Sequence, residues 1–187
     1  MKKLMSILMI GVTAVLLLTI NVYGYENEIY KIDVPSDYKE LGYQGSSVFS
    51  KSEDIGITIF SKKSEGLKKD FNTMTDSEVN EIIDTLFGYK TDIISKGKEK
   101  LGKSKSIKAR VKSSDSYMDV YIVVSDKHIL LIGFLAPSEA ELDSQEFTSI
   151  KKSFKMKEKT TNTTLLRGGL LLLAGGGSVI GYIRKRR

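Results

Sequence analysis

The sequence predicts an α+β domain, an antiparallel sheet with helices packed on it, set between an N-terminal signal and a C-terminal transmembrane helix. Three observations predict this. Two uncharged, apolar runs, Leu4 to Ile20 and Gly168 to Ile183, lie near the ends of the 187 residues. Short apolar segments with strand character come in runs between them. Two segments with helical spacing stand apart from these runs, as is typical of α+β domains.

The net charge of +6 comes from the two ends of the chain. Residues 1–24 and 165–187 hold seven of the 29 Lys and Arg residues and no Asp or Glu, which leaves 22 basic and 23 acidic residues between them. A nucleic-acid-binding domain carries its basic residues on its folded surface, so we predict no nucleic-acid partner. The absence of cysteine excludes disulfides, thiolate metal sites and cysteine nucleophiles.

The N-terminal end has the pattern of a secretory signal peptide. Lys2 and Lys3 precede the apolar run, and Val22-Tyr23-Gly24 provides small or modest residues before a cleavage point. We therefore predict a signal peptide over residues 1–24, cleaved between Gly24 and Tyr25. The alternative is an uncleaved signal anchor, because 17 apolar residues approach the length of a membrane span.

The C-terminal end predicts a transmembrane helix over residues 165–183. Its 19 residues reach about 28 Å as a helix, close to the thickness of the hydrocarbon core. The basic stop signal that follows, Arg184, Lys185, Arg186 and Arg187, is expected in the cytoplasm. A buried helix of the globular domain is the alternative, which four adjacent charges and the lack of a polar face disfavour. Gly177 and Gly181 form a GxxxG pattern that can pack helices together, but the oligomeric state stays open.

An apolar segment with a basic tail also resembles the sorting signal of wall-anchored proteins of Gram-positive bacteria. That signal needs a Leu-Pro-x-Thr-Gly-like motif upstream, whereas residues 160–164 read Thr-Thr-Asn-Thr-Thr and no proline follows Pro137. We therefore expect retention in the membrane of a Gram-positive bacterium. The chain then crosses the cell membrane once, with residues 25–157 as the extracytoplasmic domain, 158–164 as a tether and 184–187 as a cytoplasmic tail.

The exported domain opens with strands. Residues 30–34 alternate apolar and polar side chains and meet Pro35, which predicts a strand and a turn. Two further strands, residues 47–50 and 55–60, flank the polar segment 51–54 and predict a hairpin.

Residues 75–87 carry the clearest helix signal. Thr75 and Glu78 form a capping box, and Gly88 is a natural stop. One apolar face is predicted from the spacing of Val79, Ile82, Ile83 and Leu86.

Four strands and a helix complete the domain. The strands are predicted at 93–98, 106–112, 117–124 and 129–135, with the apolar stretch 121–135 as the central hairpin of the sheet. In the third of these strands the purer core face is expected from Met118, Val120, Ile122 and Val124.

A last helix is predicted over residues 138–154, after Pro137, with lysines near its C-terminus. The segment 155–164 lacks apolar periodicity, and we interpret it as the connection to the membrane.

This arrangement resembles the PsbP/Mog1-like superfamily over about residues 28–157. The resemblance rests on the opening strand Tyr30 to Pro35, the early hairpin, the helix near residue 80, the central apolar hairpin and the closing helix with Phe147 to Lys155. Members of that family usually begin with a Pro-x-x-Trp motif. This sequence has no tryptophan, and Tyr38 lies near the position where the motif has one. The resemblance implies an α/β/α sandwich around an antiparallel sheet, and a binding or assembly role with protein partners. It carries over no functional residue.

The sequence predicts no catalytic residue, cofactor or metal. His128 is the only histidine and falls at a predicted turn, without metal-ligand spacing around it. There is no Gly-x-Ser-x-Gly nucleophile elbow. A small hydrolase centred on His128 is therefore less favoured than a binding function.

Residues 90–112 are rich in lysine. Two rows, 96–100 and 108–112, alternate basic side chains along predicted strands, and a hairpin is expected to present both rows together. One reading is contact with anionic lipid or an anionic wall polymer; the other, favoured, is a strand edge protected from pairing. The residues concerned are Lys96, Lys98, Lys100, Lys103, Lys105, Lys108, Arg110 and Lys112.

These observations lead to one expectation and two alternatives. We expect a membrane-anchored extracytoplasmic binding or assembly module that engages an envelope protein at the outer face of the membrane. The first alternative is direct binding of anionic lipid or wall polymer through strands 96–112. The second is the small hydrolase.

Overall fold

The computed structural model describes residues 22–43, 46–64, 68–87, 92–113, 115–158 and 163–165. The predicted signal up to residue 21, the predicted span beyond Leu165 and the basic tail lie outside the described residues. Within the described ranges, no helix combines the length and the apolar character that crossing a membrane requires.

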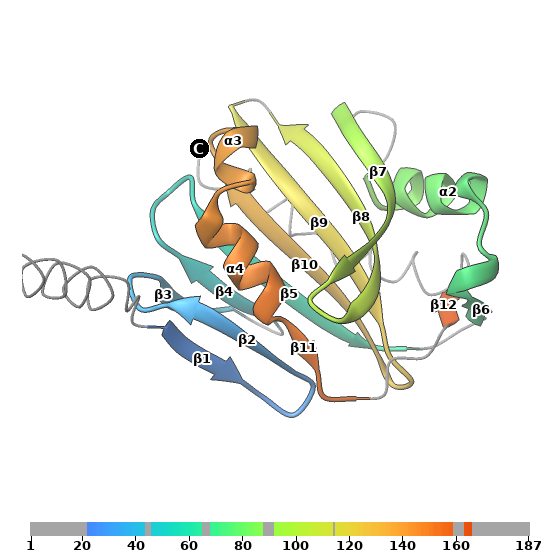
Figure 1. Ribbon diagram of the computed structural model, residues 1–187, viewed down its shortest axis with the longest axis horizontal. Coiled ribbons are helices and arrows are strands. Elements are labelled where there is room, and N and C mark those ends of the chain that lie inside the picture. The colour runs from blue at the N-terminus through green and yellow to red at the C-terminus, as the bar shows by residue number, and fades with distance from the viewer. Residues whose placement is uncertain are drawn as a thin grey trace, which may run out of the picture.

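A seven-stranded antiparallel sheet forms the centre of the fold (Figure 1). Its strands, in spatial order, are β3 (Lys39–Tyr43), β4 (Ser46–Ser50), β5 (Gly56–Lys63), β10 (His128–Ala136), β9 (Ser116–Val124), β8 (Ser104–Ser113) and β7 (Asp92–Leu101). The predicted central hairpin is confirmed, because β9 and β10 pair with each other in the middle of this order.

Smaller elements surround this sheet. A three-stranded sheet contains β1 (Val22–Glu26), β2 (Tyr30–Pro35) and β11 (Lys155–Met156), and a two-stranded one pairs β6 (Lys68–Asp70) with β12 (Thr163–Leu165). The helices are η1 (Phe71–Thr73), α2 (Asp76–Phe87), α3 (Glu139–Leu142) and α4 (Gln145–Ser153).

The predicted capping box of α2 is present. The amide of Thr75 donates to Glu78 Oε2 at 2.8 Å, and the amide of Glu78 donates to Thr75 Oγ1 at 3.3 Å. These two bonds satisfy backbone donors that have no partner inside a helix. They explain why α2 begins where the sequence predicts.

The main sheet is covered on both faces. On the α4 face, Tyr121 and Phe134 pack with Phe147 of α4. On the α2 face, Val120 and Ile122 belong to a second apolar cluster that includes the buried residues of α2. In Figure 1, α3 and α4 lie across the front of the sheet, and α2 lies beyond β7 and β8. The sheet is therefore the middle layer between two separate cores.

The expected core face of β9 is confirmed, because Met118, Val120, Ile122 and Val124 are all buried in the α2-face cluster. The opposite row adds a second buried face, which the sequence did not predict. Tyr121 is 2% exposed and Asp119 is 0% exposed. The reason is that α3 and α4 cover the α4 face, so that a charged residue there is enclosed with its partners.

The single helix predicted over residues 138–154 is two helices. Ser138 caps α3 by accepting from the amide of Glu141, and Ser144 caps α4 by accepting from the amide of Phe147. A second serine cap inside the run favours a new helix start over continuation. The break places Asp143 beside Arg110, as described below.

Five short strands were not predicted: β1, β3, β6, β11 and β12. β1 pairs with β2 in the register Gly24 to Asp33, so the predicted cleavage point between Gly24 and Tyr25 falls inside β1. β12 ends the segment predicted as a tether, includes the first residue of the predicted span, and pairs with β6.

Candidate binding groove

The lysine-rich hairpin β7–β8 does not present its two rows together. Directly opposed residues of an antiparallel pair point to the same face. Lys98 lies opposite Ile107, whose side chain belongs to the α2 face, whereas Lys108 lies opposite Tyr121 on the α4 face. The expectation of one joint basic surface is therefore wrong, because the rows occupy alternate positions in register.

The lysines on the α2 face bond the β7–β8 hairpin to the segment of η1 and α2. Lys96 Nζ lies 3.1 Å from Asp84 Oδ1 of α2. Lys98 Nζ donates to the carbonyl of Met74, and Lys105 Nζ donates to Asn72 Oδ1 at 2.8 Å. Lys100 lies opposite Lys105 in the register, and Lys103 is exposed in the turn.

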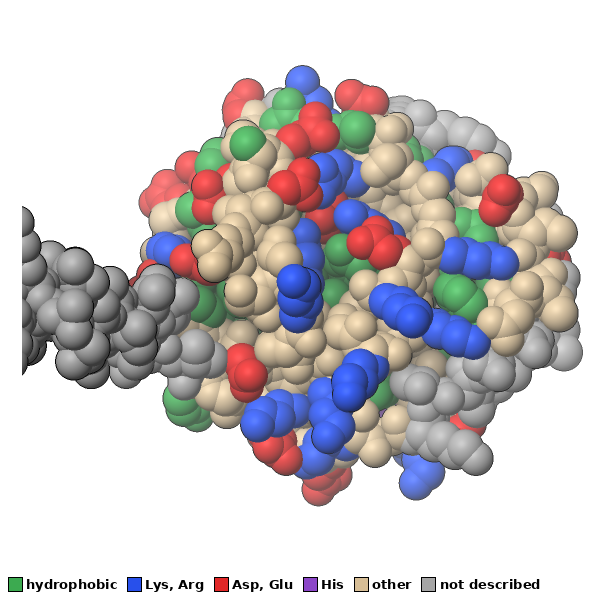
Figure 2. Space-filling view, in the orientation of Figure 1, with side chains coloured by type: hydrophobic (Ala, Val, Ile, Leu, Met, Phe, Trp, Pro, Cys, Tyr) green, Lys and Arg blue, Asp and Glu red, His purple; other side chains and the backbone are tan. Residues whose placement is uncertain are grey.

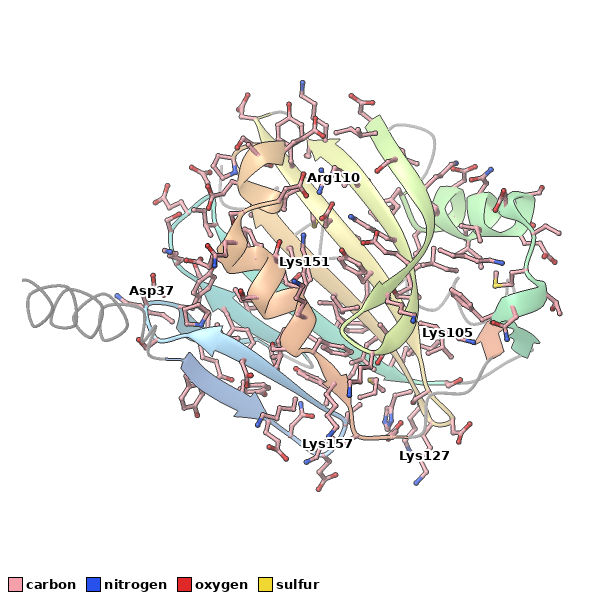
Figure 3. The ribbon with its side chains drawn as sticks, viewed as in Figure 1. Asp37, Lys105, Arg110, Lys127, Lys151 and Lys157 are labelled. Carbon is pink, nitrogen blue, oxygen red and sulfur yellow. The ribbon has the colours of Figure 1, made fainter. Side chains whose placement is uncertain are left out.

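The row on the α4 face enters a buried ionic cluster. Arg110 Nε donates to Asp119 Oδ1 at 2.7 Å, and its Nη2 donates to Asp143 Oδ1 at 2.6 Å. Lys151 Nζ of α4 lies 2.8 Å from Asp119 Oδ2, and Lys108 Nζ lies 3.5 Å from the same oxygen. Figure 3 shows Arg110 and Lys151 between the helices and the sheet.

Opposite charges compensate each other in this cluster. Burial by itself raises the pKa of Asp119, but hydrogen bonds from Arg110 and Lys151 outweigh it and the net pKa is lowered. Burial lowers the pKa of Lys151 against the attraction of Asp119. The hydrogen bond from Arg110 lowers the pKa of Asp143. Figure 2 shows basic and acidic side chains intermixed on this side. The cluster holds α3 and α4 to the sheet.

His128 takes part in a second polar cluster, with Ser125 and Glu158. Its Nδ1 lies 2.7 Å from Glu158 Oε1, and Ser125 Oγ donates to Glu158 Oε2. Serine hydrolases need the imidazole against the nucleophilic hydroxyl, whereas here the carboxylate stands between the two groups. Ser125 is also 0% exposed. These bonds fasten the segment after β11 to the β9–β10 turn.

The α2 face is hollowed where β4, β5 and β10 meet. Thr58 of β5 lies between Val48 of β4 and Gly133 of β10 in the register, and all three point to this face. Glycine has no side chain and that of threonine is short, so these positions leave space between longer neighbours. The result is a cavity of about 170 Å³, named here the sheet groove, with apolar walls that include Leu41, Val48, Met118 and Leu135.

Two carboxylates stand on the rim of the sheet groove. Glu53 and Asp54, in the β4–β5 turn, are its charged residues among those described, and both are exposed. Inside, Thr58 Oγ1 is buried without a hydrogen-bond partner. A matching ligand combines a small apolar group, a positive charge and one polar atom. His128 and the eight basic candidate residues are not part of this lining.

Sequence reasoning missed the sheet groove. Its signal was the pattern Gly56-Ile57-Thr58 in β5 together with Gly133 in β10, which places small residues on one face of adjacent strands. That signal becomes visible only once the register is known.

The comparisons with known proteins show the fold. No protein-family model and no curated protein matches the sequence. The solution structure of cyanobacterial PsbP (CyanoP) from Synechocystis sp. PCC 6803 matches with a TM-score of 0.56 and 11% identity, over 73% of this chain and 93% of that protein. A crystal structure from Bacteroides thetaiotaomicron matches with a TM-score of 0.44 and 10% identity, over 69% of this chain and 45% of its own length. The likeness to the cyanobacterial protein shows that the chain has a PsbP-like fold.

Proposed function

We propose that this protein is a membrane-anchored extracytoplasmic binding or assembly module that engages a protein partner through the sheet groove. The observation that carries the proposal is the sheet groove itself, an apolar hollow with an acidic rim on the α2 face of the main sheet. Concave apolar sites with a few placed polar groups are where proteins bind ligands. An apolar side chain with a neighbouring Lys or Arg fits this hollow.

The engagement of the buried polar groups supports a role without catalysis. Arg110 and Lys151 both donate to Asp119, and Ser125 and His128 are both bonded to Glu158. A general base or nucleophile has to be available to a substrate. The PsbP-like fold also supports a role without catalysis, because the resemblance to the PsbP/Mog1-like superfamily implies binding or assembly with protein partners.

The anchoring and the location are inferred from the sequence. Residues 165–183 provide an apolar run of spanning length, and Arg184 to Arg187 provide a cytoplasmic stop. Together with the N-terminal signal pattern they support a single-pass protein whose domain faces outward.

Direct binding of anionic lipid or wall polymer through strands 96–112 comes second. Five of the eight basic side chains concerned already bond to oxygen atoms of the domain: Lys96, Lys98, Lys105, Lys108 and Arg110. With the rows on opposite faces, fewer charges remain to meet one anionic surface.

In-cell photo-crosslinking of the full chain tests the partner function. A photoreactive residue at Ser52, on the exposed rim of the sheet groove, is expected to capture one abundant partner, whereas the same residue at the exposed Lys127 of the β9–β10 turn is expected to capture none or a different set. Filling the hollow by Gly133→Val is expected to reduce the Ser52 adduct about tenfold or more.

The matched control is Gly97→Val. A Cβ at Gly97 meets no atom within 4 Å, so this change adds the same side chain to a β-strand without filling a hollow. Equal capture by Gly133→Val and Gly97→Val, or identical adducts from Ser52 and Lys127, rules out the sheet groove as the partner site.

A further inference from the structure

We propose that the occupant of the sheet groove is an amphipathic α-helix of the partner protein. Its apolar side lies on β5 and β10, and a Lys or Arg at one end lies against Glu53 and Asp54. This inference rests on the proposed function, and it adds the conformation and the charge pattern of the segment that the partner inserts.

The two faces of β5 and β10 are covered unequally. On the α4 face, Ile57 and Ile59 are buried in the cluster that includes Phe147 of α4. On the α2 face of the same two strands, Phe60 and Leu131 are only partly buried, and so are other apolar side chains around the sheet groove. Among the residues that the structure describes, the α2 face of β5 and β10 therefore lacks the cover that α4 gives to the opposite face.

The position of α2 explains this difference. α2 contacts β7, and its buried residues share a cluster with Ile107 of β8 and Val120 of β9. β4 and β5 lie at the other end of the strand order, and Figure 1 shows α2 beside β7 and away from β3 and β4. None of the described residues that line the sheet groove comes from a helix. One more helix would complete the layer on this face.

The dimensions of the exposed strip match a short helix. Three cross-strand pairs point to the α2 face along β5 and β10: Leu135–Gly56, Gly133–Thr58 and Leu131–Phe60. The outer pairs are four residues apart along the strand, or about 13 Å at about 3.3 Å per residue. Apolar side chains at positions i, i+4 and i+7 of a helix cover about 10 Å. The small middle pair, Gly133 and Thr58, then receives the central side chain.

The backbone favours a helix over an extended segment at this place. β5 pairs with β4 on one side and with β10 on the other, so its own backbone groups are already bonded. An extended segment laid across this face would bury N–H and C=O groups without partners. A helix bonds these groups internally and presents only side chains.

The hollow itself suits a tyrosine as the central side chain. A cavity of about 150 Å³ accepts benzene, so the hollow of about 170 Å³ has room for one aromatic ring. The phenol hydroxyl would supply the hydrogen-bond partner that the buried Thr58 Oγ1 lacks.

The acidic rim sets the direction of the helix. Glu53 and Asp54 are exposed in the β4–β5 turn, at the Gly56 end of the strip, and no Lys or Arg is among the described lining residues. A basic side chain one helical turn beyond the apolar ones reaches this rim. Exposed ion pairs are individually weak. The apolar contact therefore carries the affinity, and the charges decide which end of the helix faces the turn.

Two synthetic peptides of about 16 residues, long enough for a marginal helix, test this with the full chain in phosphatidylcholine nanodiscs. Both have the same composition and the same lysines at one end. In the first, one Tyr between two Leu follows helical spacing, and in the second these three residues alternate with polar ones, as in a strand. Fluorescence anisotropy of the labelled peptide, with binding to empty nanodiscs subtracted, measures the affinity. We expect the first peptide to bind at least tenfold more tightly.

Variants of the chain test where the peptide binds. Gly133→Val is expected to weaken binding of the first peptide about tenfold or more, whereas Gly97→Val leaves it unchanged. Glu53→Lys with Asp54→Lys is expected to weaken it several-fold at low salt, and this difference disappears at high salt because exposed charges are screened. These two residues lie in an exposed turn, so the charge variant gives an answer even if Gly133→Val disturbs folding.

Equal affinity of the two peptides, or binding that neither Gly133→Val nor the charge variant weakens, overturns the proposal. Partner capture from Ser52 in cells is a separate measurement. Capture that Gly133→Val reduces, without preference for the first peptide, retains the partner function and excludes the helix. Groove binding by the first peptide without capture in cells retains the helix preference and excludes the partner function.

Discussion

Asp119 is a charged residue in a fully buried position, which is rare for an aspartate. A carboxylate with 0% exposure is tolerated because Arg110 and Lys151 both bond to it. Removing one member of such a group leaves the other charges buried without compensation, which costs more than the group contributed when complete.

The change Asp119→Ala is expected to lower the free energy of unfolding by about 3–5 kcal/mol, as for other broken buried ion pairs. Urea denaturation measures it. Asp143→Ala is the control, because that side chain is 61% exposed, and it is expected to cost about 1 kcal/mol or less. Similar decreases in the free energy of unfolding for the two variants would contradict the prediction that the buried Asp119 contributes more to stability than the exposed Asp143.

Asp119 and Asp143 make the free energy of unfolding depend on pH. The pKa values of Asp119 and Asp143 are lowered in the folded state, so the unfolded chain binds more protons in acid. Their contribution is complete above the unfolded value of about 3.9 and is lost as the pH falls through the folded values. Asp119→Asn is expected to show a shallower loss of stability below pH ~4 than the unchanged chain.

At the scale of elements, the β7–β8 turn is fixed against the end of α4. Gly102 in this turn has φ +57°, and a Cβ there would lie 2.0 Å from the carbonyl oxygen of Phe154. Only glycine satisfies both the left-handed backbone and the close approach. The turn thus ties the lysine-rich hairpin to the C-terminal end of the domain.

Gly102→Ala is expected to destabilise the protein by about 2–4 kcal/mol, the combined cost of a left-handed alanine and of overpacking. Thermal or urea unfolding measures it. Gly97→Ala, in β7 with open space around the added carbon, is expected to stay within about 0.5 kcal/mol. A small effect at Gly102 would show that the turn moves away from Phe154 at little cost.

The elements that the sequence predicted are those with strong local signals. The capping box at Thr75 and Glu78 and the apolar alternation of β9 act within one segment, so they are readable before folding. The five unpredicted strands have no such pattern and exist because a neighbouring strand pairs with them: β1, β3, β6, β11 and β12. Ser144 was readable as a helix cap, but Asp143 beside Arg110 depends on contacts between β8 and α3.

The same reasoning explains what was missed at the candidate site. The two lysine rows were recognised, but only the register of β7, β8 and β9 shows that they face opposite sides. Thr58 and Gly133 are 75 positions apart in the sequence, and nothing local connects them. Sites made by cross-strand neighbours therefore lie beyond sequence patterns, whereas the α+β arrangement does not.

For the whole molecule, the proposed location rests on the sequence of the two ends. Protease added to intact protoplasts is expected to digest residues 25–164 and to leave the C-terminal tail protected. Immunoblotting with tags at each end measures this. The control is the same digestion after lysis, which should remove both parts. Full protection of the domain in intact protoplasts would contradict the proposed location.

Because β9 is buried on both faces, its apolar residues alone do not determine its register with β8 and β10. Because side chains alternate along a strand, a slip by one residue exchanges its two faces, and a strand apolar on both sides discriminates weakly between the alternatives. Val120 and Tyr121 suit either core. Asp119 does not, since a slip moves its carboxylate away from Arg110 and Lys151 into the aliphatic cluster on the other side. One buried charge thus removes a degeneracy that the apolar residues of β9 leave open.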